Sequence, residues 1–205
     1  MTTPSAHHRR IVGRVPVLPT RPADAHPFAL EGTYGDGDAQ ITLRRIDPIA
    51  DLDVVDAWMH DHEVAQWWRL DRGRKQVANY LAHQHRLAHS AGWIAEAGGV
   101  PFAYAETYLP AADPLARFYD AQAGDRGFHV LVGDRRGTAV TRTLGHAIVD
   151  RLLAEPEATR VLCEPNVKNG RMLAWCERLG GTVSAELDLP EKRAALVTWS
   201  PEEPT

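Results

Sequence analysis

The segment 131–139 (LVGDRRGTA) combines residue types that suit the binding of a phosphate group. An apolar strand runs into a turn that holds two arginines and a glycine, and a helical pattern begins at Thr138. Such a turn points free backbone N–H groups and the positive end of a helix dipole at one spot, which suits a pyrophosphate. Gly137 allows close approach of the backbone, and Arg135 and Arg136 add charge. The Gly-Lys-Ser/Thr ending of a P-loop is absent, and an ordinary connection with exposed arginines is the alternative.

His129, just before this turn, is the candidate for proton transfer. It lies in an apolar stretch at 128–132. An imidazole titrates near neutral pH, as a general base requires. A packed core histidine is the alternative that its position alone leaves open.

The remaining histidines raise the question of a metal site. The chain has 10 histidines, and those at 60, 62, 83, 85 and 89 are close enough in sequence to share a metal. No HExxH pattern is present and neither cysteine is near them in sequence. An exposed polar face is therefore the favoured interpretation, and no metal is predicted.

The elements that must position these groups follow from hydrophobic periodicity. Gly98-Gly99 separates two apolar runs and predicts a hairpin. The succession of elements is typical of an α/β protein built around one mixed sheet. The predicted strands are 40–45, 93–96, 102–108, 128–132, 160–163 and 194–199, and the predicted helices are 51–58, 74–89, 138–153 and 169–179, with a further turn or helix at 64–68.

This order of strand, basic glycine turn, long helix, strand and Asn-led helix is similar to the acetyl-CoA-binding core of the Gcn5-related N-acetyltransferases (GNAT). The resemblance implies one central mixed, mostly antiparallel sheet flanked by helices, with the CoA pyrophosphate on the turn and the pantetheine arm between splayed strands. Asp134 stands where the family usually has Gln or Arg, so phosphate binding would rest on backbone amides and the arginines. The implied cofactor-binding residues are Val130, Leu131, Val132, Arg135, Arg136, Gly137, Thr138, Ala139, Asn169 and Cys176.

A narrower resemblance is to the branch that acylates hydroxylamines in hydroxamate siderophore assembly. Two departures are His60 in place of an Asn, and Asn166 in place of a second carboxylate. Cys176-Glu177 is similar to this branch, whereas general acetyltransferases often have a Tyr before that Glu. The segments that carry the resemblance are Trp58-Met59 with Trp68, 104–108 (YAETY), 118–120 (FYD) with 125–129 (DRGFH), and 164–169 (EPNVKN).

The resemblance implies an acyl-CoA-dependent N-acyltransferase that acts on an N-hydroxylated diamine or on the side chain of N-hydroxylysine or N-hydroxyornithine. Acetyl-CoA or succinyl-CoA would be the co-substrate, with no tightly bound cofactor. His129 would be the base. Glu164, or a water, would serve where the branch has the carboxylate that Asn166 replaces. Trp68, Glu106, Tyr108 and Asp120 would bind the acceptor, with Glu106 in the cleft on the hydroxylamine or on the distant ammonium of a diamine.

Two other functions stay open at this point. An aminoglycoside N-acetyltransferase has a similar turn and Asn-led helix, but its acceptor site should be strongly acidic. A non-catalytic acyl-CoA sensor would bind CoA without turnover, and a base at His129 argues against it.

Length and composition agree with a small cytoplasmic enzyme. The 205 residues suit one domain at 39–200 with an irregular extension at 1–38 and a tail at 201–205. The net charge of −4 is unfavourable for nucleic-acid binding. No apolar run is long enough to cross a bilayer, no secretory signal is visible, and two cysteines suit a reduced compartment. Small-molecule substrates, no nucleic acid or membrane partner, and a monomer or weak homodimer are expected.

Overall fold

The computed structural model describes residues 28–134 and 138–201, without the side chain of Thr138. The predicted contacts from Arg135, Arg136, Gly137 and the Thr138 side chain therefore lie outside the described residues, as do most of the N-terminal extension and of the tail. No helix within the described ranges is long and apolar enough to span a membrane.

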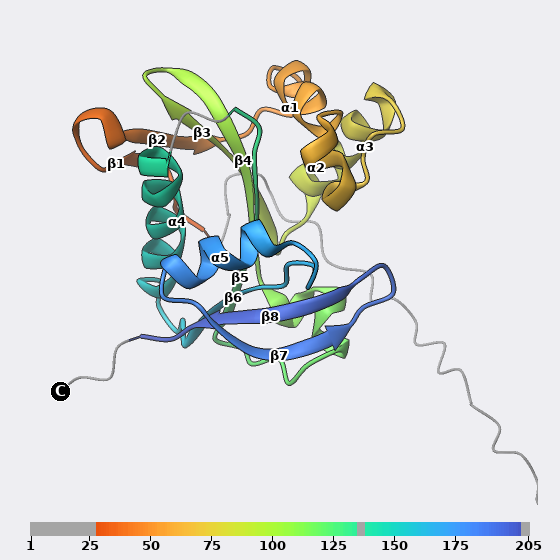
Figure 1. Cartoon of the computed structure of the whole chain (residues 1–205), viewed down its shortest axis with the longest axis vertical. Coiled ribbons are helices and arrows are strands. Elements are labelled where there is room, and N and C mark those ends of the chain that lie inside the picture. Colours follow the sequence, from red (N-terminus) through yellow and green to blue (C-terminus); the bar gives the residue numbers. More distant parts are fainter. Residues whose placement is uncertain (1–27, 135–137, 202–205) are drawn as a thin grey trace, which may run out of the picture.

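The described residues form eight strands, five α-helices and three short 3₁₀ turns (Figure 1). The strands are β1 (Gly32–Tyr34), β2 (Ile41–Arg45), β3 (Ser90–Ala97), β4 (Val100–Tyr108), β5 (Asp125–Val132), β6 (Arg160–Cys163), β7 (Thr182–Asp188) and β8 (Arg193–Trp199). The helices are α1 (Leu52–Met59), α2 (His62–Trp68), α3 (Arg74–Arg86), α4 (Thr138–Leu153) and α5 (Gly170–Arg178), and the 3₁₀ turns are Gly37–Ala39, Pro110–Ala112 and Pro114–Arg117.

All eight strands belong to one sheet, in the order β1-β2-β3-β4-β5-β6-β8-β7. Only β5 and β6 run parallel, so the prediction of a mixed, mostly antiparallel sheet is confirmed. The hairpin predicted at Gly98-Gly99 joins β3 to β4, and both glycines have positive φ (59° and 76°), as a tight hairpin turn of this kind requires. The helix predicted at 138–153 has those bounds in α4.

The structure contains two strands that the sequence analysis does not predict, β1 and β7. In addition, β5 begins at Asp125, three residues before the predicted start at 128. Regular structure therefore starts ahead of residue 40, and Phe28 and Leu30 are buried in the core. β7 (TVSAELD) carries the polar–apolar alternation of a strand, although most of its side chains are exposed at the edge of the sheet. β1 is three residues long and has no periodicity of its own; it exists through its pairing with β2.

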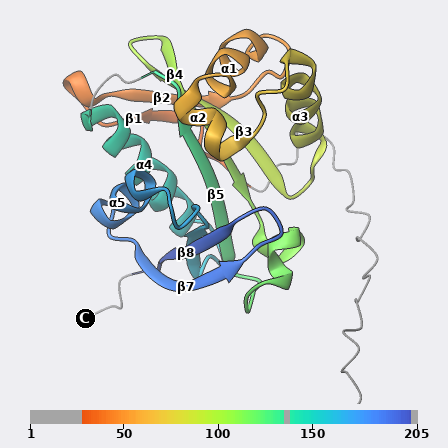
Figure 2. The same cartoon turned by 45° about the vertical axis from the view of Figure 1, so that its right-hand side comes forward.

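Alternate residues of the central strands point to two different cores. Trp93, Ala103 and Ala105 pack with α4 and α5 on one face, whereas Ile94 and Tyr104 pack with α1, α2 and α3 on the other. Figures 1 and 2 show the two helical groups on opposite sides of β4 and β5. The sheet therefore lies between the layer of α1, α2 and α3 and the layer of α4 and α5. A polar side chain on the three-helix face of β4 or β5 lies at the centre of the molecule.

Candidate active site

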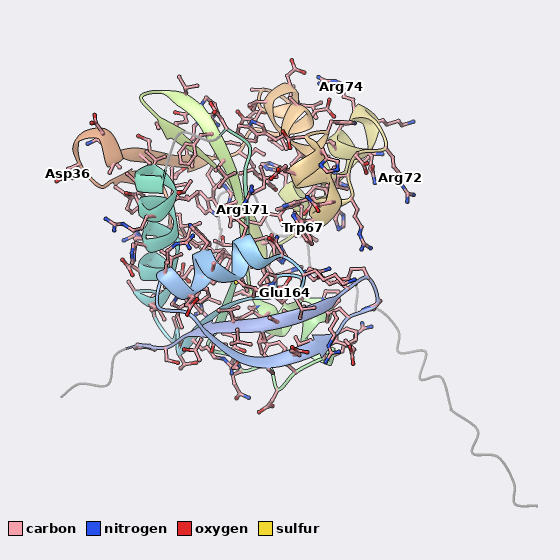
Figure 3. All side chains as sticks on the ribbon, in the orientation of Figure 1. Asp36, Trp67, Arg72, Arg74, Glu164 and Arg171 are labelled. Atoms are coloured by element: carbon pink, nitrogen blue, oxygen red, sulfur yellow. The ribbon has the colours of Figure 1, made fainter. Side chains whose placement is uncertain are left out.

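A cavity of about 1160 Å³ lies beside the C-terminal half of β5. Most of its wall comes from α2, from residues 128–133, from the segment that leads from β6 into α5, from α5 itself, and from the turn between β7 and β8. In Figure 3, Trp67 and Arg171 lie toward the middle of the molecule, between α2 and α5, and Glu164 lies below the end of α5, close to β8. His129 and Glu164 both line this cavity.

The register of β4 with β5 places Glu106 directly opposite His129. Residues two apart on a strand share a face, and directly opposed residues of antiparallel strands are in contact distance. Tyr104, Glu106 and Tyr108 of β4 therefore share a face with His129 of β5. This is the face that the three-helix layer covers.

His129 joins two carboxylates. Its Nδ1 is 3.2 Å from Glu106 Oε2, and its Nε2 is 2.6 Å from Glu164 Oε1. Glu164 follows directly on β6, so the contact bridges the gap between β5 and β6. We call Glu106, His129 and Glu164 the central cluster.

The carboxylate of Glu106 is sealed from the cavity, which corrects the expectation that it reaches into the acceptor cleft. The residue is 2% exposed. Its Oε1 accepts hydrogen bonds from the hydroxyls of Tyr80 (2.6 Å) and Tyr104 (2.7 Å), while its Oε2 faces His129. Both oxygens are thus occupied within the protein, and Glu106 is placed to orient the imidazole rather than to touch a ligand.

Glu164 lines the cavity and is held by three groups. Besides the imidazole, the hydroxyl of Tyr108 donates to its Oε2 at 2.7 Å, and the ammonium of Lys192 is 3.5 Å from its Oε1. Tyr108, predicted to bind the acceptor, is 4% exposed, does not line the cavity, and packs its ring against that of His129. Trp68 does line the cavity and meets the imidazole edge-on.

The two carboxylates determine the charge of His129. Burial opposes a charged imidazole, but Glu164 and Glu106 outweigh it and raise the pKa of His129 from 6.5 to about 10. Burial likewise opposes the charge of Glu164, yet His129, Lys192 and Tyr108 lower its pKa to about 2. Burial and the neighbouring carboxylates raise the pKa of Tyr80, Tyr104 and Tyr108 well above the usual range. At neutral pH the cluster is an imidazolium between a carboxylate at each nitrogen, with neutral tyrosines as donors.

Gly127 explains the Gly-x-His spacing of the 125–129 segment. It lies opposite Tyr108 in the β4–β5 register, on the same face as His129. A Cβ at this position would overlap the Tyr108 ring. The missing side chain thus leaves the room in which Tyr108 crosses β5 to reach Glu164.

Replacing Gly127 by alanine should lower the free energy of unfolding by about 1–3 kcal/mol, the usual cost of overpacking a filled core. Thermal or urea denaturation measures the change. The same substitution in a Tyr108→Ala background should cost much less, because the ring is gone. Equal costs in both backgrounds would mean that Tyr108 is not the group that excludes a side chain.

Residues 118–120 and Asp125, which carry part of the resemblance, make contacts within the protein and do not line the cavity. Asp125 is 1% exposed and accepts from Arg160 through both oxygens (2.8 Å each) and from the Tyr119 hydroxyl (2.8 Å). These bonds tie the starts of the parallel strands β5 and β6 together. Asp120, predicted to bind the acceptor, is exposed and outside the cavity lining; its backbone carbonyl accepts from Arg160.

β5 and β6 separate where the cavity begins. Their parallel pairing covers only 125–127 against 160–162, and beyond it no strand of the described chain pairs with this edge of β5. The following β5 residues, including Val130, Leu131 and Val132, line the cavity. Backbone N–H and C=O groups on such an edge are available to the amides of an extended ligand.

The remaining predicted ligand residues divide into two groups. Asn169 lines the cavity and caps α5, where its side chain accepts a hydrogen bond from Met172 N at 3.1 Å. Asn166 also lines the cavity, and its side chain accepts a hydrogen bond from Lys168 N. Ala139 is exposed at the start of α4 and outside the lining. Cys176 is also outside it, because its thiol points into the core, 3.6 Å from the Cys163 thiol.

Three residues of the site went unpredicted: Tyr80, Tyr104 and Lys192. Tyr80 fits the helical periodicity of 74–89 like a core residue, Tyr104 belongs to an apolar strand, and Lys192 lies in a polar turn. Each gains its role from a contact with a residue distant in the sequence or from the opposite strand. The one sequence signal for Tyr104 is the segment YAETY, in which an acid on an apolar strand lies between two tyrosines. A buried acid needs hydrogen-bond donors, and a tyrosine two residues away on the same face can supply one.

Comparison with known proteins places the chain in a family. A model described as acetyltransferase (GNAT) domain matches residues 47–189. The lysine N-acyltransferase MbtK of Mycolicibacterium paratuberculosis is 30% identical over 190 residues, which cover 90% of this chain and 78% of that protein. The N(6)-hydroxylysine O-acetyltransferase of Escherichia coli is 30% identical over 160 residues, which cover 77% of this chain and 51% of that protein.

A solved structure shares the fold. The aminoglycoside acetyltransferase AAC(6')-Ib in complex with coenzyme A aligns with a TM-score of 0.68 at 22% identity, over 79% of this chain and 95% of that chain. At this identity the likeness concerns the fold alone. The chain belongs to the GNAT family of acyltransferases, whose co-substrate is acyl-CoA, and within it to the branch of the siderophore side-chain acyltransferases.

Proposed function

We propose that this protein transfers an acyl group from acyl-CoA to the nitrogen of a hydroxylamine, forming a hydroxamate for siderophore assembly. The observation that carries the proposal is the central cluster on the cavity wall, beside the open edge of β5. A group able to transfer a proton next to an open strand edge, to which the amides of an acyl-pantetheine arm can bond, supports this activity. The names of the relatives, one of which is an N(6)-hydroxylysine O-acetyltransferase, support the same acceptor class.

Acyl-CoA would lie along the open edge of β5. The pantetheine amides can bond the unpaired backbone of residues 128–132, while the far wall comes from the segment between β6 and α5, including Asn169. The pyrophosphate would lie at the start of α4, where backbone N–H groups and the helix dipole favour an anion. The thioester carbonyl then comes close to His129.

In the reaction, the hydroxylamine nitrogen attacks the thioester carbon in the enzyme form whose imidazole is neutral, and its extra proton passes through the Glu164 carboxylate to His129 Nε2. The C–S bond breaks, and CoA leaves as a thiolate that takes a proton from solvent. Glu106 holds the Nδ1 proton, so that Nε2 is the nitrogen that exchanges a proton with Glu164. Glu164 stabilises the imidazolium that results. Asn166, on the same wall, would support the acceptor without acting as an acid or base.

The cavity does not suit an aminoglycoside. Polycationic sugars need a strongly acidic site, whereas the described lining holds four carboxylates (Asp61, Glu63, Glu164 and Glu191) against five lysine and arginine side chains (Arg69, Lys168, Arg171, Arg178 and Lys192). The hydroxylamine acceptor is therefore the better fit. A non-catalytic acyl-CoA sensor would not need the central cluster.

Thiol release from acetyl-CoA or succinyl-CoA should require an N-hydroxylated amine and be far slower with the parent amine. At pH 7 the parent amine is an ammonium ion without a free lone pair, whereas the hydroxylamine is neutral and nucleophilic. A thiol-trapping dye measures turnover, and mass spectrometry identifies the hydroxamate. Kanamycin is the comparison acceptor: rapid turnover of kanamycin with none of the hydroxylamines would contradict the proposal, and CoA binding without any turnover would support a sensor.

A further inference from the structure

The cavity wall beside the central cluster carries the Lys192 ammonium, whereas the distant ammonium of a diamine acceptor would need an anion there. Glu106, the acid nearest to His129 from β4, is sealed by Tyr80 and Tyr104. The β7–β8 turn instead brings Lys192 to the cavity wall beside the central cluster. Glu164, the acid of the cluster that does line the cavity, is already engaged by His129, Tyr108 and Lys192, so the charged group beside the cluster with donors left for a substrate is the Lys192 ammonium.

Lys192 has hydrogen-bonding capacity to spare. Its Nζ is 3.5 Å from Glu164 Oε1, beyond the 2.7–2.9 Å that is usual for a charge-assisted bond. Among the described residues no oxygen accepts a hydrogen bond from this ammonium, which can donate three. The side chain is 23% exposed, so it is partly desolvated and still open to the cavity.

Hydrogen bonds within the 189–192 turn and from Arg69 hold Lys192 in position. Leu189 N donates to Lys192 O (2.9 Å) and Lys192 N donates to Leu189 O (3.3 Å), which closes the turn. Arg69, at the end of α2, donates to the carbonyl of Glu191 at 3.1 Å and so ties the turn to the opposite wall. The guanidinium of Arg69 bonds a carbonyl there and has no ion pair among the described residues, so it adds positive charge to this end of the cavity.

We propose that Lys192 binds a carboxylate of the acceptor, so that the acceptor is an N-hydroxy amino acid rather than an N-hydroxy diamine. This rests on the proposed function. Glu164 Oε1 contacts both His129 Nε2 and Lys192 Nζ, at 2.6 and 3.5 Å, so the two nitrogens can be no farther apart than the sum of these distances. An aliphatic side chain along Trp68 and Tyr80 would connect the reacting nitrogen at His129 to a carboxylate at Lys192.

The test compares N6-hydroxylysine with N-hydroxycadaverine, which has the same aliphatic chain without the carboxylate. With acetyl-CoA as donor, we expect the native protein to prefer hydroxylysine by about 10- to 100-fold in kcat/KM, the usual worth of a hydrogen bond between charged groups. Lys192→Met should remove this preference mainly through the KM for hydroxylysine, and Lys192→Arg should keep most of it. Lys75→Met, an exposed lysine on α3, is the matched control and should keep the preference.

Each other outcome overturns a particular claim. Equal or better turnover of hydroxycadaverine by the native protein overturns the inference and leaves the proposed function intact, whereas no turnover of either hydroxylamine contradicts the proposed function itself. If Lys192→Met impairs both acceptors equally, the lysine acts through Glu164 and not on substrate. If it impairs only reactions with succinyl-CoA, the carboxylate it binds belongs to the acyl donor.

Discussion

Replacing His129 by glutamine should lower kcat about 10²–10⁴-fold, the usual contribution of a positioned general base. Glutamine keeps approximate volume and can still donate a hydrogen bond to one of the flanking carboxylates, but it takes up no proton near neutral pH. Acyl-CoA affinity should change little, because the imidazole lies on the three-helix face of β5 and the proposed pantetheine contacts are on its open edge. Steady-state kinetics and equilibrium binding of CoA measure the two effects separately.

The control for this substitution is His83→Gln, an exposed histidine on α3. It should turn over like the native protein. His129→Ala offers a second measurement, since added imidazole should restore part of its activity if the missing group is a base. A His129→Gln variant that is folded and fully active would make His129 a packing residue, and the hydroxylamine would then need no protein base.

The pH profile of kcat/KM should rise to an unusually high pH. A base must lose its proton before it can accept one, and Glu164 and Glu106 outweigh burial and hold the pKa of His129 at about 10 rather than 6.5. The ascending limb therefore lies near pH 10, and at neutral pH only a small fraction of the enzyme has a neutral imidazole. An NMR titration of labelled histidine measures the same pKa without reference to turnover.

Glu164→Gln should move both the NMR titration and the ascending limb down by about one to three pH units, because it removes one of the two negative charges that hold the proton. All variants must be compared on one substrate, since a hydroxylamine titrates as well. A rate that falls as the imidazolium loses its proton would mean that His129 works as a proton donor. A limb that stays in place in Glu164→Gln would mean that it belongs to another group.

Local patterns account for much of the fold. The apolar spacing of 138–153 predicts α4, Gly98-Gly99 predicts the β3–β4 hairpin, and Asn169 predicts a helix start because its side chain can cap the free N–H groups. These features depend on residues a few positions apart. β1 could not be found in this way, because three residues carry no periodicity and its pairing partner decides its conformation.

Residue types and their local order are enough to indicate the kind of chemistry: a basic glycine turn before a helix, and His129, Glu106 and Glu164 as the groups able to move or hold a proton. What surrounds each of these groups depends on the fold. The β4–β5 register sets Glu106 opposite His129, α3 covers that acid with Tyr80, and the β7–β8 turn delivers Lys192 to Glu164. These contacts join distant parts of the chain, and burial together with neighbouring charges sets the pKa of a group. For that reason Glu106, predicted to bind substrate, is a sealed partner of His129, and His129 holds its proton at neutral pH.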